Sequence, residues 1–452
     1  MPTVLPILSS RSAACAHFLS RLRTRHGVGD RALDRAVEAI IVAVRRDGDA
    51  ALIRLTERFD RVRIQRARMR VTAAELAAAR DQIPVVERRA LMLAARRIAA
   101  FHRRTRERSF SYRDALGMRL GQLVRPLDRV GIYVPGGRGA YPSSVLMNAI
   151  AARVAGVREI VMVSPPSPGG DHPGVLAAAA IAGVSEIYRV GGAHAVAALA
   201  YGTATIRPVD KIVGPGNLYV QAAKRLVYGV TDIDKMAGPS EVLVIADATA
   251  RPEWVAADLI AQAEHGSGDE SAVLLTPCRE IAVAVAASLA TALKDLPYAP
   301  SVRRVMATRG AAIVVGDLAE AFTLANQIGP EHLELELAHP ARWLKRVETA
   351  GAVFLGGQSP APLGDYIAGP NHVLPTGGSA RFASPLGAYD FVKRTSIIEA
   401  SAPALATLGP PSALLARMEG FEGHARAIDL RLATIGSQEG RRPNQSRHGR
   451  SR

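Results

Sequence analysis

The sequence predicts an α/β protein with two doubly wound, Rossmann-like domains, a helical N-terminal segment and a small helical C-terminal extension. Its 452 residues allow two or three domains at about 150 residues each. Apolar residues recur at three- and four-residue spacing up to residue 110, which is typical of amphipathic helices. From Val124, short Val/Ile-rich runs alternate with glycine turns and Ala-rich segments, which indicates parallel strands wrapped by helices.

The N-terminal helices are expected over residues 30–110, with a break at Asp47-Gly48. Four strand–glycine–helix units follow, whose strands are RVGIYVP, EIVMVSP, EIYRVGG and DKIVGPGN. A second series contains VLVIADATA, SAVLLTP, AAIVVGD and GAVFLGG. Two such halves place a ligand in the cleft between them. The chain becomes helical again from Ala388.

The predicted domain boundaries follow this pattern. Residues 1–28 form an N-terminal segment. Residues 29–132 and 242–386 form a discontinuous first α/β domain, and residues 133–241 form a second, nucleotide-binding-like domain. Residues 387–436 form the helical extension, and residues 437–452, which lack apolar side chains, form a disordered basic tail.

The net charge of +16 is unevenly distributed. Residues 1–129 carry +15, the last sixteen residues carry +4, and the rest carries −3. Nucleic-acid binding is one interpretation. No nucleic-acid motif accompanies the arginines, so biased amino-acid usage on solvated helix faces is the favoured explanation. The sequence contains no run of 18 apolar residues that could span a membrane. Two cysteines are too few for a disulfide framework and favour a cytoplasmic protein.

Two glycine loops, GGRG from Gly136 and GPGN from Gly214, lie between a strand and a helix. Backbone N–H groups in such loops can bind an anion, although a tight turn alone also requires glycine.

The segment PEWVAADLIAQAEH predicts a helix with Pro252 at its first position. Val255, Leu259, Gln262 and His265 fall on one stripe, so the last two side chains are expected to point inward. An amide oxygen and an imidazole one turn apart can bind one metal ion. A histidine that interacts with the helix dipole is the alternative.

Three further groups could take part in chemistry. Glu331 and His332 in GPEHLELEL place a carboxylate beside an imidazole, a general base pair near neutral pH. In an extended segment they would point to opposite faces. Asp365 and His372 lie in a long Gly/Pro loop, where Asp365 could bind zinc or form an Asx-turn. Glu419 and His424 lie in the helical tail, where spacing alone assigns them no role.

Several long motifs, in order, resemble the histidinol dehydrogenase family over roughly residues 30–432. They are RPLDRVGIYVPGGRGAYPSSVLMNAIAARVAGV, VDKIVGPGN, AGPSEVLVIAD, AQAEH, NQIGPEHLELE, GDYIAGPNHVLPT and PLGAYDFVKRTSII. The resemblance implies oxidation of L-histidinol to L-histidinaldehyde and then to L-histidine, with two NAD molecules in turn and one zinc ion. It also implies a homodimer, with the C-terminal extension at the dimer contact.

The resemblance assigns roles residue by residue. His332 matches the base that takes the alcohol proton, and Glu331 the residue that activates water. The zinc ligands match Gln262, His265, Asp365 and His424, the last supplied by the partner subunit. The substrate-binding set comprises Ser240, Gln262, His265, Glu331, His332, Asp365, His372, Glu419 and His424. NAD contacts match Tyr133, Asn217 and His194, where the family usually has Gln.

Oxidation of an alcohol to an acid requires two hydride transfers, and the second requires the hydrated aldehyde. Neither Cys15 nor Cys278 lies in a catalytic motif, so a thiol route is rejected and Glu331 with His332 must serve both steps. The alternatives are a related dehydrogenase of another small diol, such as a sulfopropanediol, a nucleic-acid-binding protein, and an inactive structural paralogue. Glu419 disfavours the sulfonate because two negative charges would repel each other.

Overall fold

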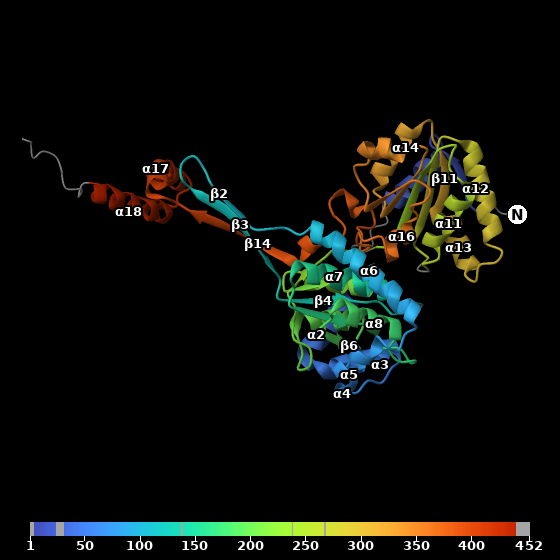
Figure 1. Ribbon diagram of the computed structural model, residues 1–452, viewed down its shortest axis with the longest axis horizontal. Coiled ribbons are helices and arrows are strands. Elements are labelled where there is room, and N and C mark those ends of the chain that lie inside the picture. The colour runs from blue at the N-terminus through green and yellow to red at the C-terminus, as the bar shows by residue number, and fades with distance from the viewer. Residues whose placement is uncertain (1–3, 24–30, 137–138, 237, 266–267, 440–452) are drawn as a thin grey trace, which may run out of the picture. The chain divides into compact units, whose positions relative to one another are not determined.

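The structure is a computed structural model that describes residues 4–23, 31–136, 139–236, 238–265 and 268–439. The chain divides into two compact units. The first unit comprises residues 1–106 and 126–391, and the second unit comprises residues 107–125 and 392–452. Figure 1 shows the mixture of helices and parallel strands, which confirms the predicted α/β class.

A six-stranded parallel sheet forms one half of the first unit. Its strands, in spatial order, are β1 (Ile7–Ser9), β11 (Gly310–Val314), β10 (Ser271–Thr276), β9 (Glu241–Ala246), β12 (His332–Glu336) and β13 (Ala352–Leu355). Every residue of β9, β10 and β12 is buried, as expected of parallel strands covered on both faces.

Helices cover both faces of this sheet. On one face lie α11 (Pro252–Ala263), α12 (Arg279–Ala292) and α13 (Ala299–Arg309). On the other face lie α1 (Ala13–Arg23) and α14 (Leu318–Ile328). Alternate residues of β9 enter the two cores, Val242 and Val244 on one side and Leu243 and Ile245 on the other, so this half is doubly wound.

A five-stranded parallel sheet forms the other half of the first unit. Its strands, in spatial order, are β6 (Glu186–Tyr188), β5 (Glu159–Val163), β4 (Arg129–Tyr133), β7 (Lys211–Val213) and β8 (Asp232–Ile233). One face packs with α9 (Gly192–Tyr201) and α10 (Leu218–Val227). The other face packs with α7 (Pro142–Ala155), against which α8 (Pro173–Ala182) and α6 (Val85–Arg104) lie.

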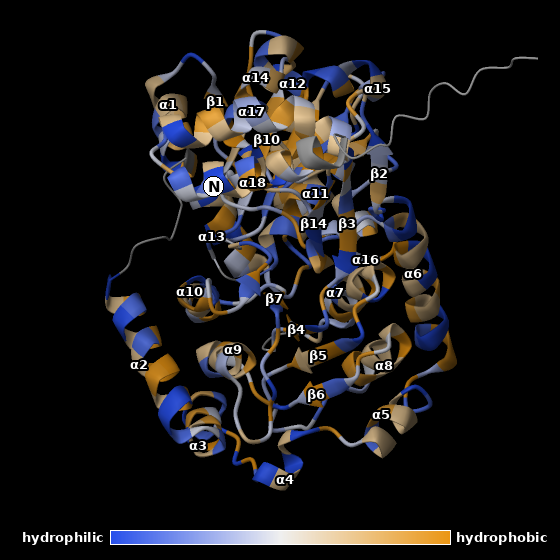
Figure 2. Cartoon of the chain, turned by 90° about the vertical axis from the view of Figure 1, so that its left-hand side faces the viewer, coloured by the Kyte–Doolittle hydropathy of each residue, from blue (hydrophilic) through white to orange (hydrophobic). Residues whose placement is uncertain are grey.

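The helices α2 (Arg31–Asp47) and α3 (Asp49–Asp60) share a core with α9 and the five-stranded sheet. Figure 2 shows them beside α9. The short helices α4 (Arg66–Met69) and α5 (Ala73–Ala79) follow them in the chain. This packing differs from the predicted grouping of residues 29–132 with 242–386, because an amphipathic face does not identify the sheet that it covers. In Figure 2 much of α2 is hydrophilic, in agreement with the exposure of Arg31, Arg35 and Arg45.

The remaining elements of the first unit are short. They are α15 (Pro340–Trp343), α16 (Ala361–Tyr366) and the 3-10 turns η1 (Leu344–Arg346), η2 (Ser379–Arg381) and η3 (Ala388–Phe391). Strand β1 belongs to the predicted N-terminal segment, yet it extends the six-stranded sheet by pairing with β11. The other domain boundaries stay a prediction.

The second unit combines two distant stretches of chain. Strands β14 (Val392–Glu399), β3 (Arg119–Pro126) and β2 (Phe110–Arg113) form a sheet in that order. Helices α17 (Ala402–Met418) and α18 (Glu422–Glu439) pack on each other. The prediction of helix from Ala388 onward was therefore wrong for β14, whose sequence VKRTSIIE has the β-branched residues of an exposed strand.

The predicted disordered tail begins inside α18, which reaches Glu439; residues 440–452 lie outside the described residues. None of the described helices is long and apolar enough to cross a membrane.

Candidate active site

The candidate catalytic residues gather at the amino ends of two neighbouring strands. Strand β12 begins at His332 and β9 begins at Glu241, and His332 is in register with Val242. The general rule for open α/β sheets puts ligands at the carboxyl ends of the strands. In the six-stranded sheet the candidate catalytic residues lie instead at the amino ends of the strands, where α11 also ends.

His332 is almost completely buried and has one ring nitrogen bound to the backbone. Its Nδ1 lies 2.9 Å from the carbonyl oxygen of Glu241. A carbonyl only accepts hydrogen bonds, so Nδ1 carries a proton. Nε2 is buried without a hydrogen-bond partner and lies 3.4 Å from Oδ1 of Asp365. The free nitrogen therefore faces a carboxylate.

The charge of these neighbours controls the imidazole. Burial alone would lower the pKa of His332, but the carboxylates of Glu331 and Asp365 outweigh it and raise the pKa to about 9. In return, His332 outweighs the burial of Asp365 and lowers the pKa of that carboxyl.

Glu331 precedes β12 and is also buried. Its Oε2 accepts a hydrogen bond from the backbone N–H of Glu241, at 3.0 Å, and its carboxylate also accepts one from the hydroxyl of Ser240. Burial raises the pKa of Glu331 to about 7. Oε2 lies 3.6 Å from Nδ1 of His332, so the two side chains converge on the backbone of one residue, Glu241. The expected opposition of adjacent side chains does not occur, because Glu331 lies outside the strand.

Asp365 was expected in a loop, but it lies near the end of the short helix α16. Pro360 and Pro362 flank its first residue and suit a helix start. The Asp365 carbonyl oxygen lies 2.7 Å from Nδ1 of His372. The other ring nitrogen of His372 lies 3.3 Å from the hydroxyl of Ser144, at the start of α7. The five-stranded half thus contributes a side chain to this site.

The predicted helix before His265 is confirmed as α11, with Pro252 in its first turn. Gln262 is buried, and its Nε2 has no hydrogen-bond partner. His265 follows the helix and is exposed, so the prediction that it points inward was wrong. Its Nδ1 lies 3.1 Å from the carbonyl oxygen of Gln262, which keeps the imidazole close to the amide.

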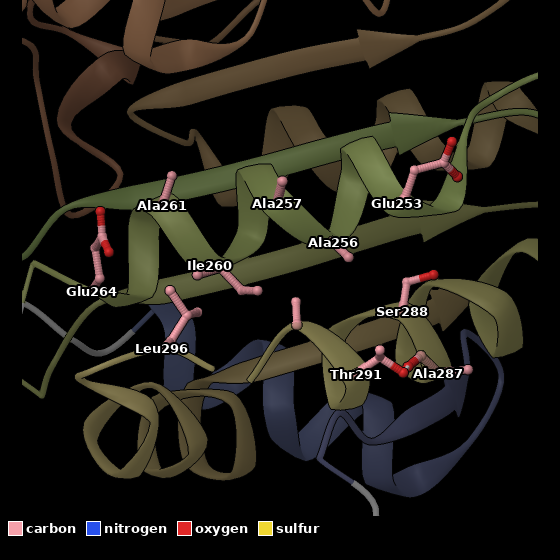
Figure 3. Close-up of a pocket in the computed structure, with 11 residues that line it drawn as sticks. Glu253, Ala256, Ala257, Ile260, Ala261, Glu264, Ala287, Ser288, Thr291 and Leu296 are labelled. Carbon is pink, nitrogen blue, oxygen red and sulfur yellow. Dashed lines mark hydrogen bonds between the residues drawn. The ribbon is translucent and has the colours of Figure 1, made fainter. Parts of the chain in front are cut away.

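A separate groove crosses the outer face of α11 (Figure 3). Small side chains such as Ala257, Ala261 and Ser288 line it between α11 and α12, and Glu253 and Glu264 lie toward its two ends. It contains none of the candidate site residues, so the exposed Glu264 belongs to this surface, as expected.

The His332 face of β12 continues with two more buried carboxyls, Glu334 and Glu336. Oε1 of Glu334 accepts a hydrogen bond of 2.6 Å from the N–H of Ala361, the first residue of α16. Asp258 on α11 lies within hydrogen-bonding reach of Glu334. Burial raises the pKa of Asp258 to about 6, of Glu334 to about 8 and of Glu336 to about 7. Of the three, Glu334 has the highest pKa and is the carboxyl that mainly keeps its proton at neutral pH.

A cavity of about 600 Å³ opens at the carboxyl ends of the five-stranded sheet. Tyr133 ends β4, His194 lies in the first turn of α9, and Asn217 caps α10; all three line the cavity. The Tyr133 hydroxyl accepts a hydrogen bond from the N–H of Gly192, at 3.0 Å. Nε2 of His194 lies 3.2 Å from the hydroxyl of Thr56.

The GPGN loop beside this cavity is rigidly held. Gly214 has a φ of 109°, and a Cβ there would lie 2.3 Å from the carbonyl oxygen of Tyr133. The buried Lys224 donates to the carbonyl oxygen of Gly214, at 2.9 Å, and pairs with the buried Asp234. Asp234 in turn accepts from the N–H of Gly214. Glycine is thus required for the turn itself. In the other loop, GGRG, Gly137 and Arg138 lie outside the described residues.

Comparison with known proteins identifies the family. A family model described as histidinol dehydrogenase matches residues 23–432. The chain belongs to the histidinol dehydrogenase family. It is 51% identical over 426 residues to the histidinol dehydrogenase of Aromatoleum aromaticum, covering 94% of this chain and 97% of that protein. Against that of Moorella thermoacetica it is 51% identical over 429 residues, covering 95% and 100%.

A solved structure agrees with this assignment. The crystal structure of histidinol dehydrogenase from Elizabethkingia anophelis has a TM-score of 0.91 and 33% identity, covering 96% of this chain and 100% of that chain. This chain is therefore an oxidoreductase of the histidinol dehydrogenase family.

Three of the four residues that the sequence predicts as zinc ligands lie in the first unit, and their side chains are suitable donors. Among the described residues, no three His, Cys, Asp or Glu side chains form a metal-binding group. The assigned set has only two such residues in the first unit, His265 and Asp365, since Gln262 contributes an amide. The buried, unpartnered amide of Gln262 and the imidazole and carboxylate donors suit zinc.

Two residues that the sequence predicts for the site of this histidinol dehydrogenase family member lie in the second unit. Glu419 follows the last residue of α17, and His424 lies in the first turn of α18. Both are exposed, and the ring of His424 packs against Phe421, with centroids 5.1 Å apart. They lie on a surface rather than within the core of their unit.

Several residues around the site could not be found from the sequence. Ser144, Glu241 and Thr56 contact His372, His332 and His194, but none lies in a pattern that indicates chemistry. Only the fold brings them there.

Proposed function

We propose that this chain oxidises L-histidinol to L-histidine through L-histidinaldehyde in two successive hydride transfers to NAD. The observation that carries this proposal is the buried pair Glu331–His332, held by the backbone N–H and carbonyl oxygen of Glu241. One ring nitrogen of His332 is committed to the backbone while the other has no hydrogen-bond partner. Such an arrangement fixes the tautomer of a base.

In the first oxidation, the neutral form of His332, which carries no proton on Nε2, accepts the hydroxyl proton of histidinol there as the hydride passes to NAD. Removal of the proton lets the C–H electron pair depart because the oxygen lone pair forms the carbonyl bond. The backbone carbonyl of Glu241 orients the ring throughout.

In the second oxidation, Glu331 removes a proton from the water that adds to the aldehyde. Its pKa of about 7 leaves part of the carboxyl ionised at neutral pH and able to accept this proton. The proton that His332 took in the first oxidation passes to the aldehyde oxygen as the water adds, which completes the hydrate and leaves His332 neutral. The hydrate then provides the second hydride to a second NAD, and His332 takes a hydroxyl proton again.

We assign the zinc ion to Gln262, His265 and Asp365, with His424 of the partner subunit as the fourth ligand. When bound, zinc supplies positive charge that orients the substrate's nitrogen atoms and offsets the Asp365 carboxylate, whose charge raises the pKa of His332. Ser240, His372 and the partner subunit's Glu419 are assigned to substrate binding. This arrangement requires a homodimer, because the exposed His424 and Glu419 must reach a second copy.

We assign the NAD contacts to Tyr133, His194 and Asn217, which line one cavity. His194 is 1% exposed, so it contributes to NAD binding mainly by packing at the cavity wall. Its Nδ1 has no hydrogen-bond partner and is the ring atom assigned to a polar contact with the cofactor. A cytoplasmic location completes the proposal and is supported by the low cysteine content.

The yield of NADH per histidinol consumed tests this function. Two NADH per histidinol, lost on addition of a chelator, are expected. One NADH with accumulation of the aldehyde would contradict the role of Glu331.

The metal assignment has its own test. His265→Asn is expected to lose zinc and activity together, measured by elemental analysis and NADH formation. His17→Asn, an exposed histidine on α1, is the control and should keep both. Full zinc content in His265→Asn would refute the ligand assignment.

A further inference from the structure

The cavity between α3, α9 and α10 contains a carboxylate that the proposed reaction does not use. Asp60 is the last residue of α3 and lines this cavity together with Tyr133 and Asn217. Its Oδ2 is buried and has no hydrogen-bond partner. Burial raises the pKa of Asp60 to about 6 because no donor compensates for the lost water. A donor bound in the cavity would supply a hydrogen bond that this carboxylate lacks.

The charges around the cavity point to the kind of donor. Among the described lining residues, Asp60 is the only one with a formal charge, and none is Arg or Lys. Arg63, Arg68 and Arg70 line a different hollow, which shares only Pro166 and Ser167 with this cavity. The cavity therefore suits a neutral group with hydroxyl or amine donors at Asp60, and it disfavours an extra phosphate.

The position of the cavity indicates which half of a dinucleotide it would hold. Glu331 and His332, where hydride transfer would occur, do not line it. A dinucleotide whose nicotinamide reaches those residues must place its other half elsewhere. The first turns of α9 and α10 line the cavity, and helix N-termini attract the negative charge of a pyrophosphate. The adenosine half then occupies the cavity.

We propose that Asp60 accepts hydrogen bonds from the ribose hydroxyls of the adenosine half and thereby makes the enzyme select NAD over NADP. This inference rests on the proposed use of a nicotinamide dinucleotide. The 2′-hydroxyl donates to a carboxylate, whereas the 2′-phosphate of NADP removes that donor and adds negative charge beside Asp60. No described cation of the cavity compensates for it.

Equilibrium binding of NADH and NADPH to the full-length, zinc-loaded enzyme tests this proposal without turnover. Cofactor fluorescence is recorded in the absence of histidinol. The wild-type enzyme should bind NADH more tightly than NADPH. In Asp60→Asn the affinity for NADH should fall by about tenfold or more, since a hydrogen bond to a charged group is lost. The affinity for NADPH should stay constant or rise, so the preference between the two cofactors shrinks by at least about tenfold.

Asp47→Asn is the matched control. Asp47 ends the neighbouring helix α2, pairs with Arg46 and Arg54, and does not line the cavity. It removes the same charge from the same helical layer, so its preference for NADH should match that of the wild type.

A second measurement needs no variant. NADH that lacks the adenosine 2′-hydroxyl should bind the wild-type enzyme about tenfold more weakly than NADH. This comparison keeps the proposal testable if Asp60→Asn does not fold.

The outcomes separate this inference from the proposed function. A wild-type enzyme that binds NADPH as tightly as NADH, an Asp60→Asn variant with an unchanged preference, or equal binding of the 2′-deoxy cofactor would overturn the role of Asp60 alone. A wild-type enzyme that binds neither cofactor would overturn the proposed function, and this inference with it.

Discussion

The carboxyl cluster of Asp258, Glu334 and Glu336 contributes a pH dependence to stability that one substitution should largely remove. Buried carboxyls with raised pKa values keep their protons in the folded protein at a pH where the unfolded chain has released them. The free energy of unfolding therefore falls as pH rises from about 4.5 to about 8. Glu334→Gln should remove much of this dependence. The introduced amide can accept from the N–H of Ala361, as Glu334 does, and can donate to Asp258.

The size of the effect follows from the pKa of Glu334. A change from 4.5 to about 8 corresponds to at most about 5 kcal/mol, at about 1.36 kcal/mol for each tenfold change in proton affinity. At pH 5 the variant should be as stable as the wild type, because protonated glutamic acid and glutamine are nearly alike. At pH 8 the variant should be more stable, by up to that amount.

Urea denaturation followed by circular dichroism at pH 5, 6, 7 and 8 measures this difference. A chelator keeps metal binding from contributing. Glu38→Gln, an exposed carboxyl on α2, is the control and should follow the wild type at every pH. Parallel curves for Glu334→Gln and the wild type would show that Glu334 does not hold a proton in the folded protein.

Three further predictions concern the cofactor loop and the substrate site. Lys224→Met should lower the free energy of unfolding by about 3–5 kcal/mol, because it leaves Asp234 buried and unpaired; thermal unfolding checks this, and an unchanged transition would contradict it. Gly214→Ala should cost at least about 1–3 kcal/mol and weaken NADH binding, measured by fluorescence; wild-type affinity would show that the loop can shift. Ser144→Ala should raise the KM for histidinol but not the Kd for NADH, because His372 loses a partner; an unchanged KM would remove Ser144 from the substrate site.

The elements that the sequence predicts well are those whose pattern is local. The apolar run VLVIA predicts the buried strand β9, and Gly214 before α10 has a positive φ that favours glycine. These constraints act within a few residues, so they are visible without the fold. The same holds for α11, whose start at Pro252 and apolar stripe were both recognisable.

The features that escape sequence reasoning depend on distant contacts. His265 shares a stripe with Val255 and Leu259, yet it lies beyond the helix and is exposed, because the helix ends before the periodicity does. Strand β14 is stabilised by β3, which lies far away in the sequence. Asp60 was read only as part of an amphipathic helix, since nothing in its surroundings shows that α3 ends at a cavity.

The composition of the second unit has a consequence for synthesis on the ribosome. Strands β2 and β3 emerge early, but their sheet is completed by β14, which is made after nearly all of the first unit. The edge of β3 that pairs with β14 therefore stays unpaired while the chain between the two strands is translated. A message truncated after residue 391 would still encode the whole of the first unit. The hairpin of β2 and β3 would then lack β14, and the product would lack Glu419 and His424. Such a product would combine a complete reaction pair with an exposed strand edge prone to aggregation.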